Sequence, residues 1–504
     1  MVSQPSVLVL AGGRILDSRP LQILLSLLVG ALIGYQAPNL ALALLIFAGV
    51  SIIGGLCLLE INWAIWLLIL LSPFHFALKA VTSSGVVDVW RELFFLLILA
   101  SWLLQVLLGK RPPPQLSVLN LVVAGYLLWG VVAILNSASL LVGLAGFRFI
   151  FSFVPLYFVA SSTITNEKEV KRFVAAILAS GVVVALIAIL QFILVKLLGV
   201  LEKGTSIDFA RPVAGAAKAA GIPWERATSV FLGPNELGVF LAICLTLGCS
   251  YYWSAERRKR HPWLLLLVLA IMGMGLLASM SRSSMLGLVV ALLTLTLVKR
   301  RVGPVVVLCL AGIVLLAVAS VYLEALFRPA YELSDPYFSQ TWQEALTSRM
   351  VWRSPIMGHG YGFTHSVAEK LGIDTSSLLD ISGVDIYAIL AIAQIGLVGF
   401  SLFLLGWVLF VRNAYRGARR PDRSEFMKDT AAGICAAFLG IMVTSAHAAA
   451  WEYVSFAAGY YLLAAIASWT GDRQTKTSQD HREEGDGPVG SQDARVGVPQ
   501  GGAR

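Results

Sequence analysis

Long apolar runs alternate with short polar breaks along almost the whole chain. Each run is close to the roughly 20 residues that a helix needs to cross about 30 Å of hydrocarbon. Hydropathy therefore predicts about fourteen membrane-spanning helices, with a count good to about two. The predicted spans are 21–36, 40–59, 62–79, 92–109, 116–136, 142–163, 171–199, 229–253, 262–279, 284–298, 303–324, 385–411, 430–447 and 451–469.

Every other break is rich in Lys and Arg. These clusters are Lys110-Arg111, the Lys168/Lys171/Arg172 group, Arg257 to Arg260, Lys299 to Arg301, and the run from Arg412 to Lys428. Cytoplasmic loops of membrane proteins carry an excess of basic residues, so these breaks and both termini are predicted to be cytoplasmic. The breaks between them lack such clusters and are predicted to be extracytoplasmic, including 200–228 and 325–384. The pattern thus predicts an all-α polytopic membrane protein.

Composition agrees with this fold class. Of 504 residues, 58% are hydrophobic and only 13% are charged, which is too little charge to cover a soluble surface. A net charge of +9 would suggest nucleic-acid binding in a soluble protein. Here the positive charge lies mostly in the short loops beside apolar runs. The predicted partner is therefore the lipid bilayer, and binding to nucleic acid is not expected. Residues 471–504 are polar and are predicted to form a disordered cytoplasmic tail.

Two of the predicted outer loops, 200–228 and 325–384, are long enough to suggest a functional role. The sequence has no phosphate-binding loop, nucleophilic serine elbow or metal-ligand spacing, so no cofactor or metal is predicted. The larger loop, which is expected to be partly helical, contains tryptophans, arginines, histidines and carboxylates. Its stretch from Gly358 to Gly362 would either let backbone amides approach a phosphate or form a turn.

Three arginines on the predicted outer side suggest an anion-binding site. Arg148 lies inside an apolar run, where a charge costs at least ~2.5 kcal/mol unless it is paired or solvated. Arg226 opens the segment RATSVFLGPNELGVF, and Arg282 lies at a tight turn between two spans. Guanidinium groups bind phosphate oxygens through two parallel hydrogen bonds. The alternatives are snorkelling for Arg226 and Arg282 and a structural ion pair for Arg148.

Several motifs occur in the order of one known family. They are RATSVFLGPNELGVF, SRSSMLGL, and the block from SPIMGHGYG to VDIYAILAIAQIGLVGF. In this order the chain resembles the O-antigen ligase and O-antigen polymerase superfamily over roughly residues 140–470, with residues 1–139 as additional N-terminal helices. The resemblance implies a GT-C-like, metal-independent glycosyltransferase of the bacterial inner membrane. It would move a glycan from an undecaprenyl-diphosphate carrier to the hydroxyl of a glycan or lipid-sugar acceptor.

The resemblance also assigns roles to individual residues. Arg226, Arg282 and Arg349 match the arginines thought to hold the diphosphate. The ligase pattern has a histidine where this chain has Asp385, followed at the family's spacing by Gly396 and Gly399. An aspartate can serve as a general base if burial raises its pKa. The alternatives are a helix-terminal role for Asp385 and close helix packing for the two glycines.

Other residues are candidates for the same reaction. His365 and His447 would replace Asp385 as the base, and Trp342 and Trp352 would stack on sugar rings or anchor a loop at the membrane interface. The ten residues between Arg349 and Gly360 match the spacing of O-antigen polymerases and favour that activity slightly.

The predicted function is therefore polymerase-type or ligase-type transfer in O-antigen or exopolysaccharide synthesis. Two alternatives remain. One is a transporter of a small anion such as bicarbonate. The other is a non-catalytic component that works with other envelope polysaccharide assembly proteins.

Overall fold

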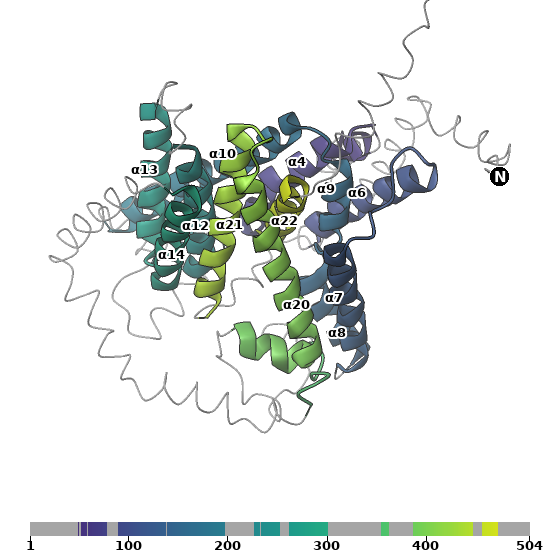
Figure 1. The fold of residues 1–504 in the computed structure, drawn as a ribbon. Coiled ribbons are helices and arrows are strands. Elements are labelled where there is room, and N and C mark those ends of the chain that lie inside the picture. The colour runs from purple at the N-terminus through teal and green to yellow at the C-terminus, as the bar shows by residue number, and fades with distance from the viewer. Residues whose placement is uncertain are drawn as a thin grey trace, which may run out of the picture. The chain divides into compact units, whose positions relative to one another are not determined.

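The structure is a computed structural model, and within the residues that it describes all regular structure is helical (Figure 1). The described residues are 49, 52–57, 59–77, 89–137, 139–196, 226–231, 233–252, 262–300, 354–361, 387–446 and 456–471. Two predicted spans, 21–36 and 303–324, and the tail after Gly471 lie outside them.

The helices follow the predicted apolar runs closely. They are α4 (Ile61–Leu71), α6 (Trp90–Leu107), α7 (Val118–Leu135), α8 (Leu140–Phe151), α9 (Leu156–Thr163), α10 (Glu167–Lys196), α12 (Pro234–Tyr252), α13 (Pro262–Ser279), α14 (Arg282–Lys299), α20 (Tyr387–Arg419), α21 (Glu425–Ser445) and α22 (Ala457–Gly471), with a short 3-10 turn, η1 (Ser72–Phe74). Eight helical segments of the described residues are long and apolar enough to cross a membrane, and two shorter apolar helices accompany them.

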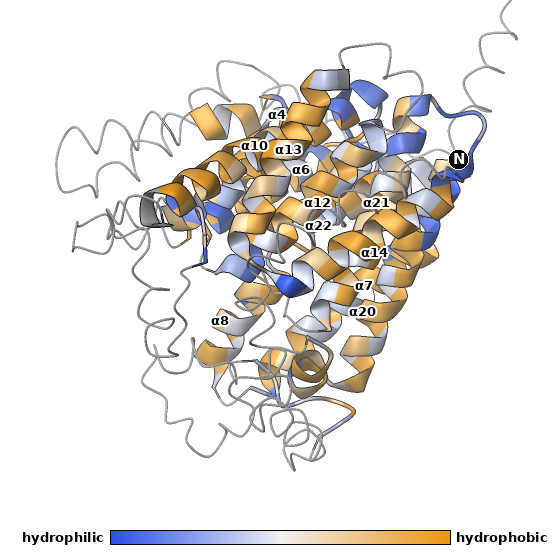
Figure 2. Ribbon diagram, turned by 90° about the vertical axis from the view of Figure 1, so that its left-hand side faces the viewer, coloured by the Kyte–Doolittle hydropathy of each residue, from blue (hydrophilic) through white to orange (hydrophobic). Residues whose placement is uncertain are grey.

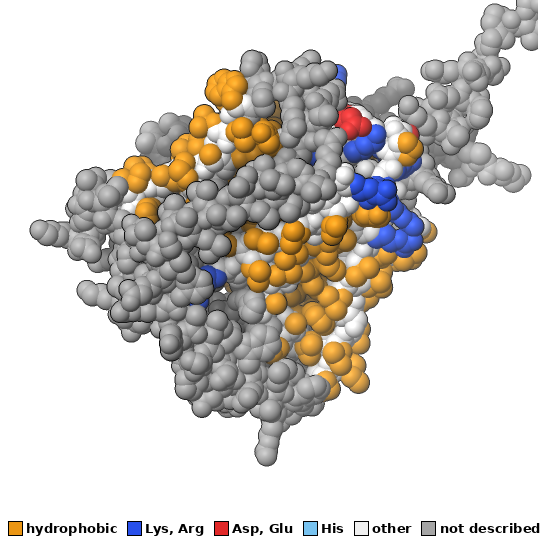
Figure 3. Space-filling view, turned by 60° about the vertical axis from the view of Figure 1, so that its left-hand side comes forward, with side chains coloured by type: hydrophobic (Ala, Val, Ile, Leu, Met, Phe, Trp, Pro, Cys, Tyr) orange, Lys and Arg blue, Asp and Glu red, His pale blue; other side chains and the backbone are white. Residues whose placement is uncertain are grey.

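These findings confirm an all-α polytopic membrane protein. Figure 2 shows hydrophobic residues along the lengths of helices such as α7, α14 and α20. In Figure 3 apolar side chains cover a broad exposed surface, and Lys and Arg gather beyond one edge of it. Such a surface suits contact with lipid. The predicted division into 1–139 and 140–470 stays a prediction, although helices from both sides of that boundary, such as α7 and α20, pack together.

Two helices differ from the predicted spans for local reasons. The run 142–163 is divided into α8 and α9 by a turn, because Pro155 has no amide hydrogen to continue the helix. Helix α20 continues beyond the predicted end at 411 to Arg419, with Arg416 and Arg419 in its last turn. Basic residues are favourable there because the C-terminal end of a helix carries partial negative charge.

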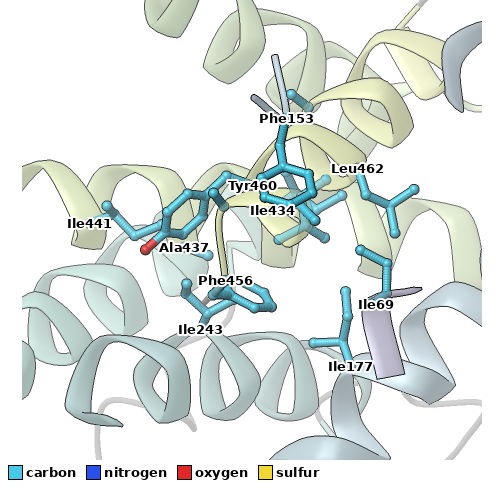
Figure 4. Packing of buried hydrophobic residues seen from close by; sticks show 14 of the residues in the cluster. Ile69, Phe153, Ile177, Ile243, Ile434, Ala437, Ile441, Phe456, Tyr460 and Leu462 are labelled. Atoms are coloured by element: carbon cyan, nitrogen blue, oxygen red, sulfur yellow. The ribbon is translucent and has the colours of Figure 1, made fainter. Parts of the chain in front are cut away.

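Small residues allow α12, α14 and α21 to pack very closely. A Cβ atom on Gly287 of α14 would lie 2.7 Å from the carbonyl oxygen of Gly440 on α21, so the two backbones are in contact. Thr444 of α21 also donates a hydrogen bond to the carbonyl of Ser283, at 3.2 Å. Small residues at such crossings are typical of membrane helices. Beside this contact, Ile243, Ile434, Phe456 and Tyr460 belong to one buried hydrophobic cluster (Figure 4).

Helix α20 is broken at Gly396, which has φ 68° and ψ 179°. The residues 354–361 cross the break, and we call them the strap. His359 and Gly360 of the strap donate to the carbonyls of Ala393 and Gln394, at 2.7 and 2.9 Å. In return, Leu397 donates to the carbonyl of Pro355, at 2.7 Å. Trp129 of α7 donates its indole N–H to the carbonyl of Ile395, at 2.7 Å. The protein itself therefore satisfies the backbone groups that the break exposes.

The basic clusters that the structure describes lie together at one end of the helices. Ser424, before α21, donates to a carboxylate oxygen of Glu167 at the start of α10, at 2.6 Å. Lys171 lies 5.1 Å from the ring centre of Phe426. Lys299, at the end of α14, forms a buried ion pair with Asp429 of α21, at 2.5 Å. This common end is what the alternation of basic breaks predicts.

We expect Gly396→Ala to destabilise the fold strongly. Its φ belongs to a region that only glycine adopts easily, and the new Cβ would lie 2.1 Å from the carbonyl oxygen of Ile356. Strain and overpacking together predict a loss of about 2–5 kcal/mol. Thermal unfolding in detergent measures the effect. Gly273→Ala is the control, because the added Cβ meets no atom within 4 Å beyond its chain neighbours and the nearby backbone of its own helix. An unchanged melting temperature for both variants would contradict the role of the break.

Candidate anion-binding site

Arg226 is held by two oxygens beside the start of α12. Its Nε donates to the carbonyl of Ser279, at 3.0 Å, and its Nη2 donates to Oδ1 of Asn235, at 2.8 Å. Ser279 ends α13, and Asn235 is the second residue of α12. These two hydrogen bonds orient the guanidinium between the end of α13 and the start of α12.

The two turns that carry these residues are strained. Ser229, three residues after Arg226, has φ 53°, and Met280, next to Ser279, has φ 48°. Positive φ is uncommon outside glycine and costs about 1–3 kcal/mol, which the surrounding structure must offset. One offsetting contact is Gln191 of α10, whose side-chain oxygen accepts from the amides of Thr228 and Ser229, at 3.1 and 2.8 Å. Such strain is often found at functional sites.

Arg282 begins α14 directly after the same turn. Its side chain is exposed, and it forms no hydrogen bond or ion pair with any residue that the structure describes. The neighbouring Ser281 donates to Oδ1 of Asn235, at 3.0 Å, and lies 2.8 Å from Oγ of Ser284. Asn235 thus connects Arg226 with the turn that carries Arg282.

Close approach of α12 and α14 makes this arrangement possible. A Cβ atom on Gly238 of α12 would lie 2.6 Å from Oγ of Ser284 and 2.7 Å from Cβ of Ser281. A larger residue at this position would push α14 away from Asn235. The glycine of the sequence PNELG therefore has a packing role that serves the site.

A second charged cluster involves the starts of α6 and α12. Glu92 of α6 pairs with Arg148 of α8, with 3.3 Å between Oε1 and Nε and with side chains that are 11% and 34% exposed. Arg91 is fully buried and interacts electrostatically with Glu92, Arg148 and Glu236 of α12. Two cations and two anions balance one another here. The ion pair considered for Arg148 is therefore present, and its role in substrate binding stays a prediction.

The structure brings together some of the predicted site residues. Arg226 and Arg282 lie on either side of one turn, and Arg148 belongs to the charged cluster that includes Glu236, the neighbour of Asn235. The remaining candidates lie outside the described residues: Arg349, Trp342, Trp352, Asp385, His365 and His447. For Gly358–Gly362, the amides of His359, Gly360 and Tyr361 already donate to protein oxygens, which agrees with the turn and not with a phosphate site.

Sequence reasoning missed several residues of this site. Arg91 and Glu92 stand at the start of the predicted span 92–109, where charged residues are common, and Glu236 is a single acidic residue within the predicted span 229–253. Asn235 and the serines 279, 281 and 284 are polar residues close in the sequence to Arg226 or Arg282. Their positions in the sequence do not reveal that they contact one another. Among known proteins, no family model matches this sequence and no curated relative is found.

We expect Glu92→Gln to lower the stability of the protein. The change leaves the buried Arg91 and Arg148 with one carboxylate fewer, and breaking a buried pair typically costs about 3–5 kcal/mol. Partial exposure of Arg148 places the expected loss near the lower value. Glu425→Gln is the matched control, because its pair with Lys428 is more exposed, with side chains 54% and 26% exposed. Thermal unfolding would contradict a structural ion pair if both variants melted like the wild type.

Proposed function

We propose that this protein is an integral membrane glycosyltransferase of the O-antigen ligase or polymerase type. The observation that supports it best is the pair Arg226 and Arg282, which flank one turn at the end of the helices opposite the basic clusters. Two guanidinium groups at a membrane surface suit the diphosphate of a polyprenyl carrier. The proposed substrate is a glycan linked to undecaprenyl diphosphate, and the acceptor is a sugar or lipid-sugar hydroxyl.

In the proposed reaction, an acceptor oxygen forms a bond to the anomeric carbon. The bond from that carbon to the diphosphate oxygen breaks, and its electron pair leaves with the carrier. Arg226 and Arg282 stabilise the charge that develops on the departing diphosphate, and because Arg226 is oriented in advance, little reorganisation is needed. Asp385, His365 or His447 takes the acceptor proton, while Trp342 and Trp352 stack on the sugars. These roles require no metal ion.

The orientation follows from the charge distribution. With the basic clusters in the cytoplasm, the two arginines and the loops 200–228 and 325–384 face the outside of the bacterial inner membrane. Both termini are then cytoplasmic. A lipid-linked glycan that has already been moved across the membrane would meet the site on that side.

A transporter is a less suitable alternative. Transporters often bind their substrate at broken helices with unpaired backbone groups, and α20 is broken at Gly396. Here, however, the amide of Leu397 and the carbonyls of Ala393, Gln394 and Ile395 are bonded to the strap and to Trp129. These groups are therefore already occupied. The other alternative is a non-catalytic assembly component. Substitution of the two arginines would abolish transfer activity in an enzyme, and the experiment below measures that loss.

We expect Arg226→Lys and Arg282→Lys to lose nearly as much activity as the alanine variants, by at least about tenfold. A lysine keeps the charge but cannot form the two parallel hydrogen bonds. Surface-glycan chain length and the lipid-linked pool in the native bacterium measure the loss. Arg416→Lys, on an exposed residue at the opposite end, is the control. If lysine variants that insert normally gave wild-type glycan, the proposed diphosphate site would be wrong.

A labelling experiment tests the orientation. In a background without native cysteines, we expect Asn136→Cys to react with a membrane-impermeant maleimide in intact cells, and Ser424→Cys to react only after the membrane is opened. Both residues are exposed and lie at opposite ends of the helices. Labelling of position 424 in intact cells would place the basic end outside and remove the arginines from the proposed face.

A further inference from the structure

Helix α10 carries an exposed stripe along almost its whole length. Apart from Lys171, every exposed side chain of this helix that the structure describes belongs to the stripe. Its members recur every three or four positions, so they share one face of the helix. They are basic at the start of the helix and apolar along the rest. The stripe consists of Lys168, Arg172, Ala175, Ala179, Val183, Leu186, Leu190 and Ile193.

The length of the apolar part of the stripe matches the thickness of a membrane. Arg172 and Ile193 lie 21 positions apart in one continuous helix. At 1.5 Å per residue this separation is about 31 Å, close to the roughly 30 Å of hydrocarbon in a bilayer. Arg172 therefore lies at the level of the phospholipid headgroups, and Lys168 lies one turn further from the hydrocarbon.

Arg172 is positioned by an aromatic ring of a second helix. Its Cζ lies 4.7 Å from the ring centre of Trp63 on α4. Trp63 is itself 41% exposed, and tryptophans concentrate at the level of the headgroups. Arg172 forms no hydrogen bond or ion pair with any residue that the structure describes. The contact with the ring thus holds the guanidinium at the surface without occupying its N–H donors.

The acidic residues in the first turn of α10 have other partners. Glu167 pairs with Lys171, with 2.6 Å between Oε1 and Nζ. Oε1 of Glu169 accepts from Nδ2 of Asn62 on α4, at 2.6 Å. Neither carboxylate forms an ion pair with Arg172. The basic start of the stripe therefore suits an anionic group from outside the protein.

We propose that Lys168, Arg172 and Trp63 form a binding site for one anionic phospholipid. The phosphate accepts parallel hydrogen bonds from the guanidinium of Arg172, and Lys168 adds a second positive charge. The acyl chains lie along the stripe from Ala175 toward Val183, which is about 16 Å from Arg172 and hence half of the hydrocarbon thickness. A lipid bound here contacts both α4 and α10. The site does not depend on the proposed glycosyltransferase activity.

Binding of defined lipids to the purified full chain in detergent tests the proposal. The probes are phosphatidylglycerol and phosphatidylethanolamine with identical acyl chains, and native mass spectrometry measures their affinities. We expect the wild type to prefer phosphatidylglycerol. Arg172→Ala should weaken phosphatidylglycerol binding by about fivefold, the effect of one basic residue near an anionic lipid surface. Phosphatidylethanolamine binding and thermal stability without added lipid should not change, because Arg172 is exposed.

Two further variants examine the geometry of the site. Arg172→Lys keeps the charge but not the fork, so its affinity for phosphatidylglycerol should lie between those of the wild type and the alanine variant. Trp63→Leu keeps an apolar side chain but removes the ring that positions Arg172. We expect it to weaken phosphatidylglycerol binding by about twofold, since an exposed cation–π contact is weak.

Arg419→Ala is the matched control. Arg419 is also an exposed arginine at the basic end of the helices, and its Cζ lies 5.5 Å from the ring centre of Tyr415. It stands seven positions after Arg412, where the apolar run of α20 ends, and so lies well outside the hydrocarbon. The control should bind phosphatidylglycerol like the wild type.

Two results would overturn the proposal. One is equal affinity of the wild type for phosphatidylglycerol and phosphatidylethanolamine. The other is equal weakening of phosphatidylglycerol binding in Arg419→Ala and Arg172→Ala, which would show that the lipid responds only to the total positive charge of this end of the protein.

Discussion

The structure depends on one constraint: hydrocarbon offers no hydrogen-bond partner to the backbone or to a charge. An unsatisfied backbone group in this medium costs several kcal/mol, so a chain can leave the helical path only where protein groups replace the missing bonds. The break at Gly396 shows the solution. The strap and Trp129 bind the carbonyls of residues 393–395 and the amide of Leu397. Without these contacts α20 would have to be continuous.

The same constraint explains how the structure treats its charges. Where charges are buried, as for Arg91 and Glu92 or for Lys299 and Asp429, each cation has an anion beside it. Arg226 is oriented by the amide of Asn235 and by a carbonyl. The first arrangement stabilises the packing of helices, and the second fixes the orientation of the Arg226 guanidinium between α12 and α13.

The helices could be predicted well because the length of an apolar run is set by the thickness of the bilayer. The predicted run 262–279, for example, matches α13, and 229–253 matches α12 within a few residues. The break in α20 could not be predicted from Gly396 alone, because glycine is equally common in close helix crossings such as that at Gly287. Only the partner segment, 36 residues earlier at Gly360, distinguishes the two.

The candidate site was predictable in part. Arg226 and Arg282 could be identified as candidates because each is an arginine at the end of an apolar run on the side without basic clusters. Asn235 could not be identified in this way, because its hydrogen bond with Ser281 joins residues that lie 46 positions apart in the chain. Contacts at such separation depend on how helices α12 and α14 approach each other, which in turn depends on Gly238. Hydropathy along a single chain contains no information on that approach.

The strap has a consequence for how the chain can vary in evolution. Because residues 354–361 are fixed against α20 and against Ser137, the chain between Arg300 and Tyr387 has an anchored point within it. Insertions or exchanges in 301–353 can therefore occur without shifting the start of 362–386, and the reverse is also true. The two segments on either side of the strap in the chain can thus diverge independently of each other in sequence and length.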